Sequence, residues 1–271
     1  MLSVQFKRLF YSKYFYLSLI IGSLIAIFQY AQITSMVFAD LKDRALSGHS
    51  PAIPDSSYLL WMYSSLSEIA NLSLVLLPIL AVIPYGIQLL TDRKTNYAQL
   101  MIMKAGKHRY LFSMLAVSAA AGFLVIVLPL LLNFLLFAIT FPSIAPNQFL
   151  YYMYSPGSYQ VLFFDLHQSF PFLHTMIYIT LAGLVGGFFA MFATSLGLIV
   201  RFQLLLVVVP LLFTFILSMI DEFLQLSLAP YDFLHMVNAL PTELFYVYIF
   251  FGLLLLGTAA FYGIGVRNIG K

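Results

Sequence analysis

Long runs of apolar residues recur along this 271-residue chain, and shorter segments between them carry most of the charges. Each run holds about 20 residues, enough for an α-helix to cross the ~30 Å hydrocarbon layer of a bilayer. The apolar residues do not alternate with polar ones, which excludes a transmembrane β-barrel. Six membrane-spanning helices are expected near residues 14–37, 69–90, 111–140, 173–200, 202–220 and 244–266.

Composition agrees with this pattern. Apolar residues make up 62% of the chain and charged residues only 8%, whereas a soluble domain carries about a quarter charged residues. We therefore expect an all-α polytopic membrane protein. Residues 1–271 contain no internal repeat and no linker, so they should form a single transmembrane domain. The chain also lacks cysteine, which excludes disulfides and thiolate ligands within it.

The basic residues predict the orientation, because Lys and Arg accumulate in short cytoplasmic segments. With the N-terminus inside, only Lys42 and Arg44 lie outside, so both termini should be cytoplasmic in a cell membrane, the bacterial plasma membrane. The net charge of +3 is too small to indicate nucleic-acid binding. The eleven inner basic residues are Lys7, Arg8, Lys13, Arg93, Lys94, Lys104, Lys107, Arg109, Arg201, Arg267 and Lys271.

Two segments outside the spans show amphipathic patterns. Residues 1–13 place Leu2, Phe6, Leu9 and Phe10 on one helical face and Gln5, Arg8 and Ser12 on another. This pattern predicts an elbow helix lying flat on the inner leaflet. Residues 221–243 alternate acidic and apolar groups around Pro230. We expect two short re-entrant helices, broken at Pro230 and packed on the bundle, because irregular backbone in a membrane must be satisfied by protein or water.

The chemistry of an intramembrane enzyme is missing from the spans. Every charged residue and histidine falls in a loop or at a span end, whereas such enzymes and ion-driven transporters need ionisable groups inside. His167 and His174 could share a helix face, but no acid has metal-ligand spacing beside them, so interfacial histidines are favoured over a metal site. We expect no cofactor or metal on this chain.

The polar residues inside the spans are neutral. Gln29, Gln32 and Asn133 either form interhelical hydrogen bonds or line a polar cavity. Small residues spaced four, four, three and four apart predict a close-packing face, within this chain or against another one. These residues are Ala182, Gly186, Ala190, Ala193 and Gly197.

The inner loop at 91–109, TDRKTNYAQLMIMKAGKHR, combines charges with a short apolar helix. A purely solvated loop does not need Leu100, Met101, Ile102 and Met103. These side chains lie on the membrane surface or fill a groove on a cytoplasmic partner, and the loop alone does not choose between the two.

This layout resembles the permease subunits of type 2 ATP-binding-cassette exporters. In that family an elbow helix precedes six spans, and a re-entrant helix pair, similar to residues 226–240 here, lies between spans five and six. The inner loop of the family opens with an acid and a basic pair, continues as a helix and ends with Pro or Gly and basic residues. Asp92, Arg93 and Lys94 match the opening, with Asp92 where the family usually has Glu, and Gly106 matches the end.

The resemblance implies an exporter of peptides, antibiotics or lipid-like molecules. Two permease copies, or this chain and a homologue, would pair in the lipid above two ATP-binding subunits. ATP and Mg²⁺ would be bound by those subunits, and the permease itself would not be an enzyme. The alternatives are an intramembrane enzyme or a sensor, immunity or scaffold protein of similar topology. The residues implied to couple the permease to the ATPase are Asp92, Arg93, Lys94, Tyr97, Leu100, Met101, Lys104 and Gly106.

Overall fold

The computed structural model describes the chain except for residues 48–55, 66, 146–160, 237–241 and 269–271. The described part is helical and contains no strand. Five helices are long and apolar enough to cross a membrane, which fits a polytopic α-helical membrane protein. They are α2 (Lys13–Leu46), α7 (Lys107–Thr140), α10 (Pro171–Leu196), α11 (Gln203–Leu224) and α13 (Leu244–Asn268).

The span expected near 69–90 is divided into two helices by a turn. Helix α4 (Glu68–Val82) has 15 residues, about 22 Å of helix, which is shorter than the ~30 Å hydrocarbon layer. A turn at 83–87 follows, and α5 (Gln88–Lys94) continues the chain. Pro84 lacks the N–H that a helix interior requires. At Gly86 a Cβ atom would lie 2.7 Å from the Val82 carbonyl oxygen, so only glycine fits this turn.

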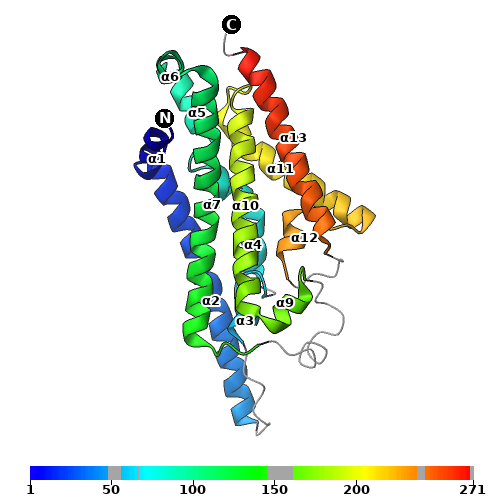
Figure 1. Ribbon diagram of the computed structural model, residues 1–271. Helices are drawn as coiled ribbons and strands as arrows, with labels where there is room; N and C mark the ends of the chain where they lie inside the picture. Colours follow the sequence, from blue (N-terminus) through cyan, green and yellow to red (C-terminus); the bar gives the residue numbers. More distant parts are fainter. Residues whose placement is uncertain (48–55, 66, 146–160, 237–241, 269–271) are drawn as a thin grey trace.

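Helices α7 and α10 pack along each other at the centre of the bundle (Figure 1). Their backbones approach closely, since a Cβ added at Gly122 would lie 2.5 Å from the Gly186 carbonyl oxygen. Ala182, Ala190 and Ala193 on α10 are fully buried. The small-residue face of α10 therefore packs within this chain, while α2 packs on α7 and α13 on α10.

The two ends of the bundle differ in their short elements (Figure 1). One end, named the α6 end, carries α1 (Leu2–Phe10), α5, α6 (Tyr97–Ala105) and the last turns of α13. The other, named the α9 end, carries α3 (Ser57–Leu60) and α9 (Phe164–Ser169), with α12 (Pro230–Leu234) on its side of the bundle.

The re-entrant pair differs from the expectation. Helix α11 runs to Leu224, and α12 begins at Pro230 instead of being broken there, because proline suits the first position of a helix. Phe233 and Leu234 of α12 are buried, and the remainder of the expected pair, residues 237–241, lies outside the described residues. The sequence did not reveal a second inserted segment, residues 57–65, in which Trp61 and Tyr63 are buried in the core. The two segments meet where Met236 N donates to the Tyr63 carbonyl oxygen at 2.8 Å.

Candidate functional site

The N-terminal helix α1 packs on the bundle through side chains of both its polar and its apolar face. Gln5 and Leu9 are fully buried, whereas Leu2 and Phe10 are about half exposed. An amphipathic helix lying flat on a membrane would instead turn Gln5 and Arg8 to water. Gln5 and Arg8 face the rest of the chain, because their polar partners Tyr85 and Asp92 lie in the turn between α4 and α5 and on α5.

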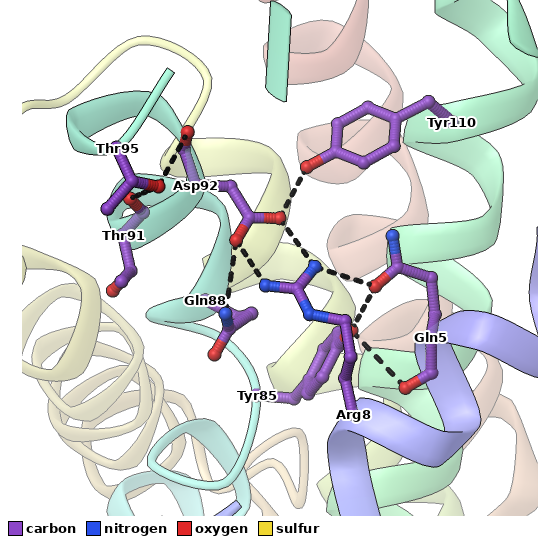
Figure 2. Close-up of polar contacts among 8 residues, drawn as sticks. All are labelled: Gln5, Arg8, Tyr85, Gln88, Thr91, Asp92, Thr95 and Tyr110. Carbon is purple, nitrogen blue, oxygen red and sulfur yellow. Dashed lines mark hydrogen bonds and ion pairs between the residues drawn. The ribbon is translucent and has the colours of Figure 1, made fainter. Parts of the chain in front are cut away.

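An ion pair between Arg8 and Asp92 forms the centre of this contact (Figure 2). Asp92 is buried on α5. Arg8 Nη1 donates to Asp92 Oδ2 at 2.8 Å, and Arg8 Nη2 donates to Oδ1 of the same carboxylate. Tyr110 Oη and Gln88 Nε2 also donate to the carboxylate, at 2.6 Å and 3.1 Å. The buried negative charge is therefore paired and fully hydrogen-bonded, as a buried charge must be.

The remaining contacts hold the guanidinium of Arg8 in place. Its Cζ lies 4.4 Å from the centre of the Tyr97 ring, and Nη1 also donates to Gln5 Oε1 at 3.1 Å. Tyr85 Oη donates to the same oxygen at 2.5 Å. Burial opposes the charged form of Arg8, but the hydrogen bond and the charge of Asp92 outweigh it and raise the pKa of Arg8. Arg8 therefore stays charged at every physiological pH.

Arg93, the next residue on α5, binds a different helix. Its Nη1 donates to the carbonyl oxygens of Gly197 and Leu198 at 3.1 Å and 3.0 Å. Both carbonyls follow the last turn of α10, where unpaired carbonyls and the helix dipole favour a cation. Two adjacent side chains of α5 thus attach it to α1 and to α10.

Helix α6 has an inner and an outer face. Ala98 is buried, and Met101 and Ile102 pack on the core. On the outer face Leu100 is 53% exposed and Met103 is 75% exposed. Gly106 joins α6 to α7 with φ +82°, a backbone angle that side-chain-bearing residues seldom adopt.

The eight residues of the expected coupling site thus have three kinds of environment. Asp92, Arg93 and Tyr97 contact other parts of this chain, and Met101 packs inward beside them. Gly106 is the joint to α7, and the outward residues are Lys94, Leu100 and Lys104. Their role in coupling stays a prediction, and of the apolar pair only Leu100 is available to a partner.

Sequence reasoning did not find Gln5, Arg8, Tyr85 and Tyr110 as members of this site. One signal was present in the sequence. The segments assigned to the inner side contain eleven basic residues and a single acid, Asp92. A single acid inside an apolar protein requires a cationic partner. Nothing in the spacing indicates that the partner is Arg8, because the two residues are 84 positions apart in the sequence.

Gln29 and Asn133 are fully buried and bind each other, with Asn133 Nδ2 donating to Gln29 Oε1 at 2.7 Å. They also hold the inserted segment: Met62 N donates to Asn133 Oδ1 at 2.8 Å, and Gln29 Nε2 donates to Ser65 Oγ at 2.8 Å. This arrangement corresponds to the hydrogen-bonding alternative. A groove of about 610 Å³ between α10 and α13 is lined almost entirely by apolar side chains and by none of Gln29, Gln32 and Asn133.

His167 and His174 are buried together at the α9 end, with their Nδ1 atoms 3.2 Å apart. His174 Nε2 lies 2.8 Å from the Leu162 carbonyl oxygen, which can only accept a hydrogen bond. Nε2 therefore carries the proton of a neutral His174, and its Nδ1 accepts from His167. Among the described residues no group of three or more His, Cys, Asp or Glu side chains could hold a metal ion.

Comparisons with protein-family models, with curated proteins and with solved structures return no match to this chain.

Proposed function

We propose that the chain is the membrane-spanning permease subunit of an ATP-driven exporter of the ATP-binding-cassette type 2 class. A separate subunit binds ATP and Mg²⁺, and a second permease copy or a homologue completes the unit in the cell membrane, with both termini cytoplasmic. The substrate is a peptide, an antibiotic or a lipid-like molecule. One observation carries the proposal: α6 presents exposed apolar side chains, while α5 beside it is bonded to α1 and α10.

This arrangement suits the transmission of force. A partner that displaces α6 also displaces α5, because only two residues separate the helices. The motion reaches α1 through Asp92 and Arg8, and from there α2. It reaches α10 through Arg93. One contact at the α6 end therefore acts on two membrane-spanning helices, as a rigid-body rearrangement of the bundle requires.

The length of α7 supports a position for α6 outside the hydrocarbon. Helix α7 has 34 residues, about 51 Å, which exceeds the ~30 Å hydrocarbon layer. It begins with three consecutive basic or titratable residues, Lys107, His108 and Arg109. Such residues lie at or beyond the headgroups. Helix α6 precedes them, so Leu100 and Met103 are presented on the aqueous side.

The experiment that tests the proposal is purification of the chain in mild detergent, followed by identification of bound proteins. We expect an ATP-binding subunit to co-purify and to hydrolyse ATP. Leu100→Glu and Leu100→Lys should both reduce co-purification, because each places a charge against an apolar groove. Gln99→Glu alters an exposed polar neighbour and is the matched control.

The same variants separate a docking helix from a helix on the membrane surface. An anionic inner leaflet attracts cations, so a surface helix tolerates Leu100→Lys far better than Leu100→Glu. A sensor or scaffold protein would retain a partner, but that partner would not hydrolyse ATP. Unchanged assembly and ATP turnover in both Leu100 variants would mean that α6 does not contact the ATPase.

A further inference from the structure

The groove of about 610 Å³ lies between α10 and α13, which run side by side in the bundle (Figure 1). Its lining comes from α10, from the beginning of α13 and from the segment that leads into α9, and no described residue of the lining is charged. The lining contains two hydroxyl groups. Thr180 Oγ1 donates to the Met176 carbonyl oxygen at 2.8 Å, and Tyr248 is 69% exposed. The groove therefore suits a hydrocarbon group, which needs no hydrogen bonds.

The length of the groove corresponds to one leaflet of a bilayer. Helix α10 has 26 residues, about 39 Å, which exceeds the ~30 Å hydrocarbon layer, so Leu173 in its first turn lies at the level of the headgroups. The last lining residues of the two helices are Phe188 and Phe251, whose ring centres are 4.8 Å apart. The groove ends where these rings meet. From Leu173 to Phe188 it follows about 22 Å of α10, enough to reach the middle of the bilayer.

Beside α9 the groove is lined by a residue with an unusual backbone conformation. Phe163 has φ +58° and ψ +49°, in the left-handed region that bulky residues rarely adopt. Such a conformation persists only where the surrounding structure fixes it. Leu162, the residue before it, is fixed on both sides: its N donates to Tyr178 Oη at 2.9 Å, and its carbonyl oxygen accepts from His174 Nε2 at 2.8 Å. The Phe163 ring is therefore a preformed part of the groove.

We propose that this groove binds one acyl chain of a membrane phospholipid as a resident ligand. The headgroup lies at the α9 end, and the chain runs along α10 until it reaches Phe188 and Phe251. Lipid tails are as apolar as the lining, so close packing in a preformed groove retains the chain, and expulsion of water does not. This binding requires only that the protein lies in a bilayer, so it does not depend on the proposed function.

A hydrocarbon chain fits the groove better than a peptide does. An extended peptide would leave backbone N–H and C=O groups without partners against the apolar lining. A helix about 10 Å wide and about 22 Å long would occupy about 1,700 Å³, far more than the volume of the groove. The surrounding bilayer supplies acyl chains in excess.

The test titrates the delipidated chain, in mild detergent, with a phosphatidylcholine that carries a photoreactive diazirine near the end of one acyl chain. After illumination, mass spectrometry of peptides locates the adducts. Adducts on residues 244–251 of α13, across the groove from α10, should saturate at about one probe per chain. Adducts on the exposed apolar face of α2, which includes Ile20 and Leu24, should rise in proportion to the probe without saturating.

Two substitutions should remove the saturable adducts. Leu184 lines the groove and is 43% exposed, so Leu184→Trp fills the groove without overpacking the core and should reduce adducts on 244–251 about tenfold or more. The matched control is Leu135→Trp, at an exposed leucine of α7 outside the groove, which should change them about twofold or less. Phe163→Gly removes the ring but keeps a residue that tolerates the left-handed backbone, and it should also reduce the adducts. An unfolding midpoint equal to that of the native chain shows that each variant is folded.

Native mass spectrometry of the chain purified from its membrane identifies the ligand, and we expect one retained phospholipid that is lost in Leu184→Trp. Retention of only a free fatty acid or another amphiphile would overturn the assignment to a phospholipid. Adducts on 244–251 that never saturate, or that fall equally in Leu184→Trp and Leu135→Trp, would mean that the groove holds only exchanging lipid. A dimer of the native chain that carries no lipid and dissociates in Leu184→Trp would assign the groove to a second copy.

Discussion

The two ends of the bundle attach their short segments through different polar contacts. At each end polar side chains attach a non-spanning segment to the rest of the bundle. At the α6 end the attachment of α1 is an ion pair between Arg8 and Asp92. Toward the α9 end the inserted segment 57–65 is held by two neutral amides, Gln29 and Asn133.

The difference follows from access to water. Gln29 and Asn133 are 0% exposed, on helices that cross the bundle. The side chain of Arg8 remains 25% exposed. Burying a charge costs far more than burying a hydrogen-bonded amide, and a partly hydrated guanidinium avoids most of that cost. The contact is therefore an ion pair at the α6 end, where water reaches Arg8, and a pair of neutral amides in the bundle, where water reaches neither Gln29 nor Asn133.

The largest expected effect comes from placing a charge in the neutral cluster. In Asn133→Asp an acceptor replaces the amide that donates to Ala26 O at 2.9 Å and Gln29 Oε1 at 2.7 Å. A buried, unpaired carboxylate among carbonyl oxygens should lower the free energy of unfolding by about 3 kcal/mol or more. Unfolding in mixed micelles with a denaturing detergent measures this loss. Asn133→Leu removes the same donors without adding a charge, so a loss no larger in Asn133→Asp than in Asn133→Leu would contradict the comparison.

The reverse substitution at the α6 end is Asp92→Asn. It leaves the Arg8 guanidinium without a counter-charge, at a cost of about 2 to 3 kcal/mol in the free energy of unfolding. Adding Arg8→Gln gives this end the neutral amide chemistry of the other and should recover most of the loss. If Asp92→Asn alone has the same free energy of unfolding as the native chain in the same micelle titration, the charges of the Arg8–Asp92 pair do not contribute to stability.

The apolar pattern predicted most membrane-crossing helices because lipid demands long helices without charges. The pattern did not predict the turn at 83–87 in the second span. Pro84 and Gly86 favour this turn over a helix through local backbone chemistry that apolar patterning does not reveal. Helix ends were also misplaced. Helix α2 continues to Leu46, well past the apolar run, because charged residues outside the hydrocarbon remain compatible with helix.

The site was less predictable, since it depends on packing between distant segments. Asp92 and Arg8 meet only because α1 folds back against the bundle. Leu100 and Met101 are adjacent apolar residues, and sequence alone does not assign either to the outer face. The packing of Ala98, Met101 and Ile102 on the core sets the rotation of α6 and leaves Leu100 outside.

Acidification should act on the α9 end through His167. Burial, and secondarily the charge of His174, lowers the pKa of His167 to about 3 from its ordinary value of 6.5. Between these values the unfolded chain binds the proton and the folded chain does not, so stability is lost as pH falls below 6.5. The loss from His167 should reach about 2 kcal/mol at pH 5.

The ion pair at the α6 end provides the contrast, since Arg8 keeps its charge throughout this pH range. The readout is the difference in the free energy of unfolding between pH 7.5 and pH 5 for the native chain and for His167→Gln. The variant retains a hydrogen-bond donor toward His174 and should lose about 2 kcal/mol of the pH dependence. An unchanged pH dependence in the variant would place the acid sensitivity elsewhere.

The smallest expected effect distinguishes charged from neutral acceptors within the α6 end itself. Tyr110 Oη donates to the carboxylate of Asp92 at 2.6 Å, and Tyr85 Oη donates to the amide oxygen of Gln5 at 2.5 Å. Both rings are buried, so replacement by Phe removes one hydroxyl from similar surroundings. Tyr85→Phe should cost about 1 kcal/mol and Tyr110→Phe about 2 kcal/mol, because hydrogen bonds to charged groups are stronger. Repeating both substitutions in the Asp92→Asn chain tests the cause. If the carboxylate charge produces the difference of about 1 kcal/mol, it should vanish there, whereas a difference that persists would trace to packing of the rings.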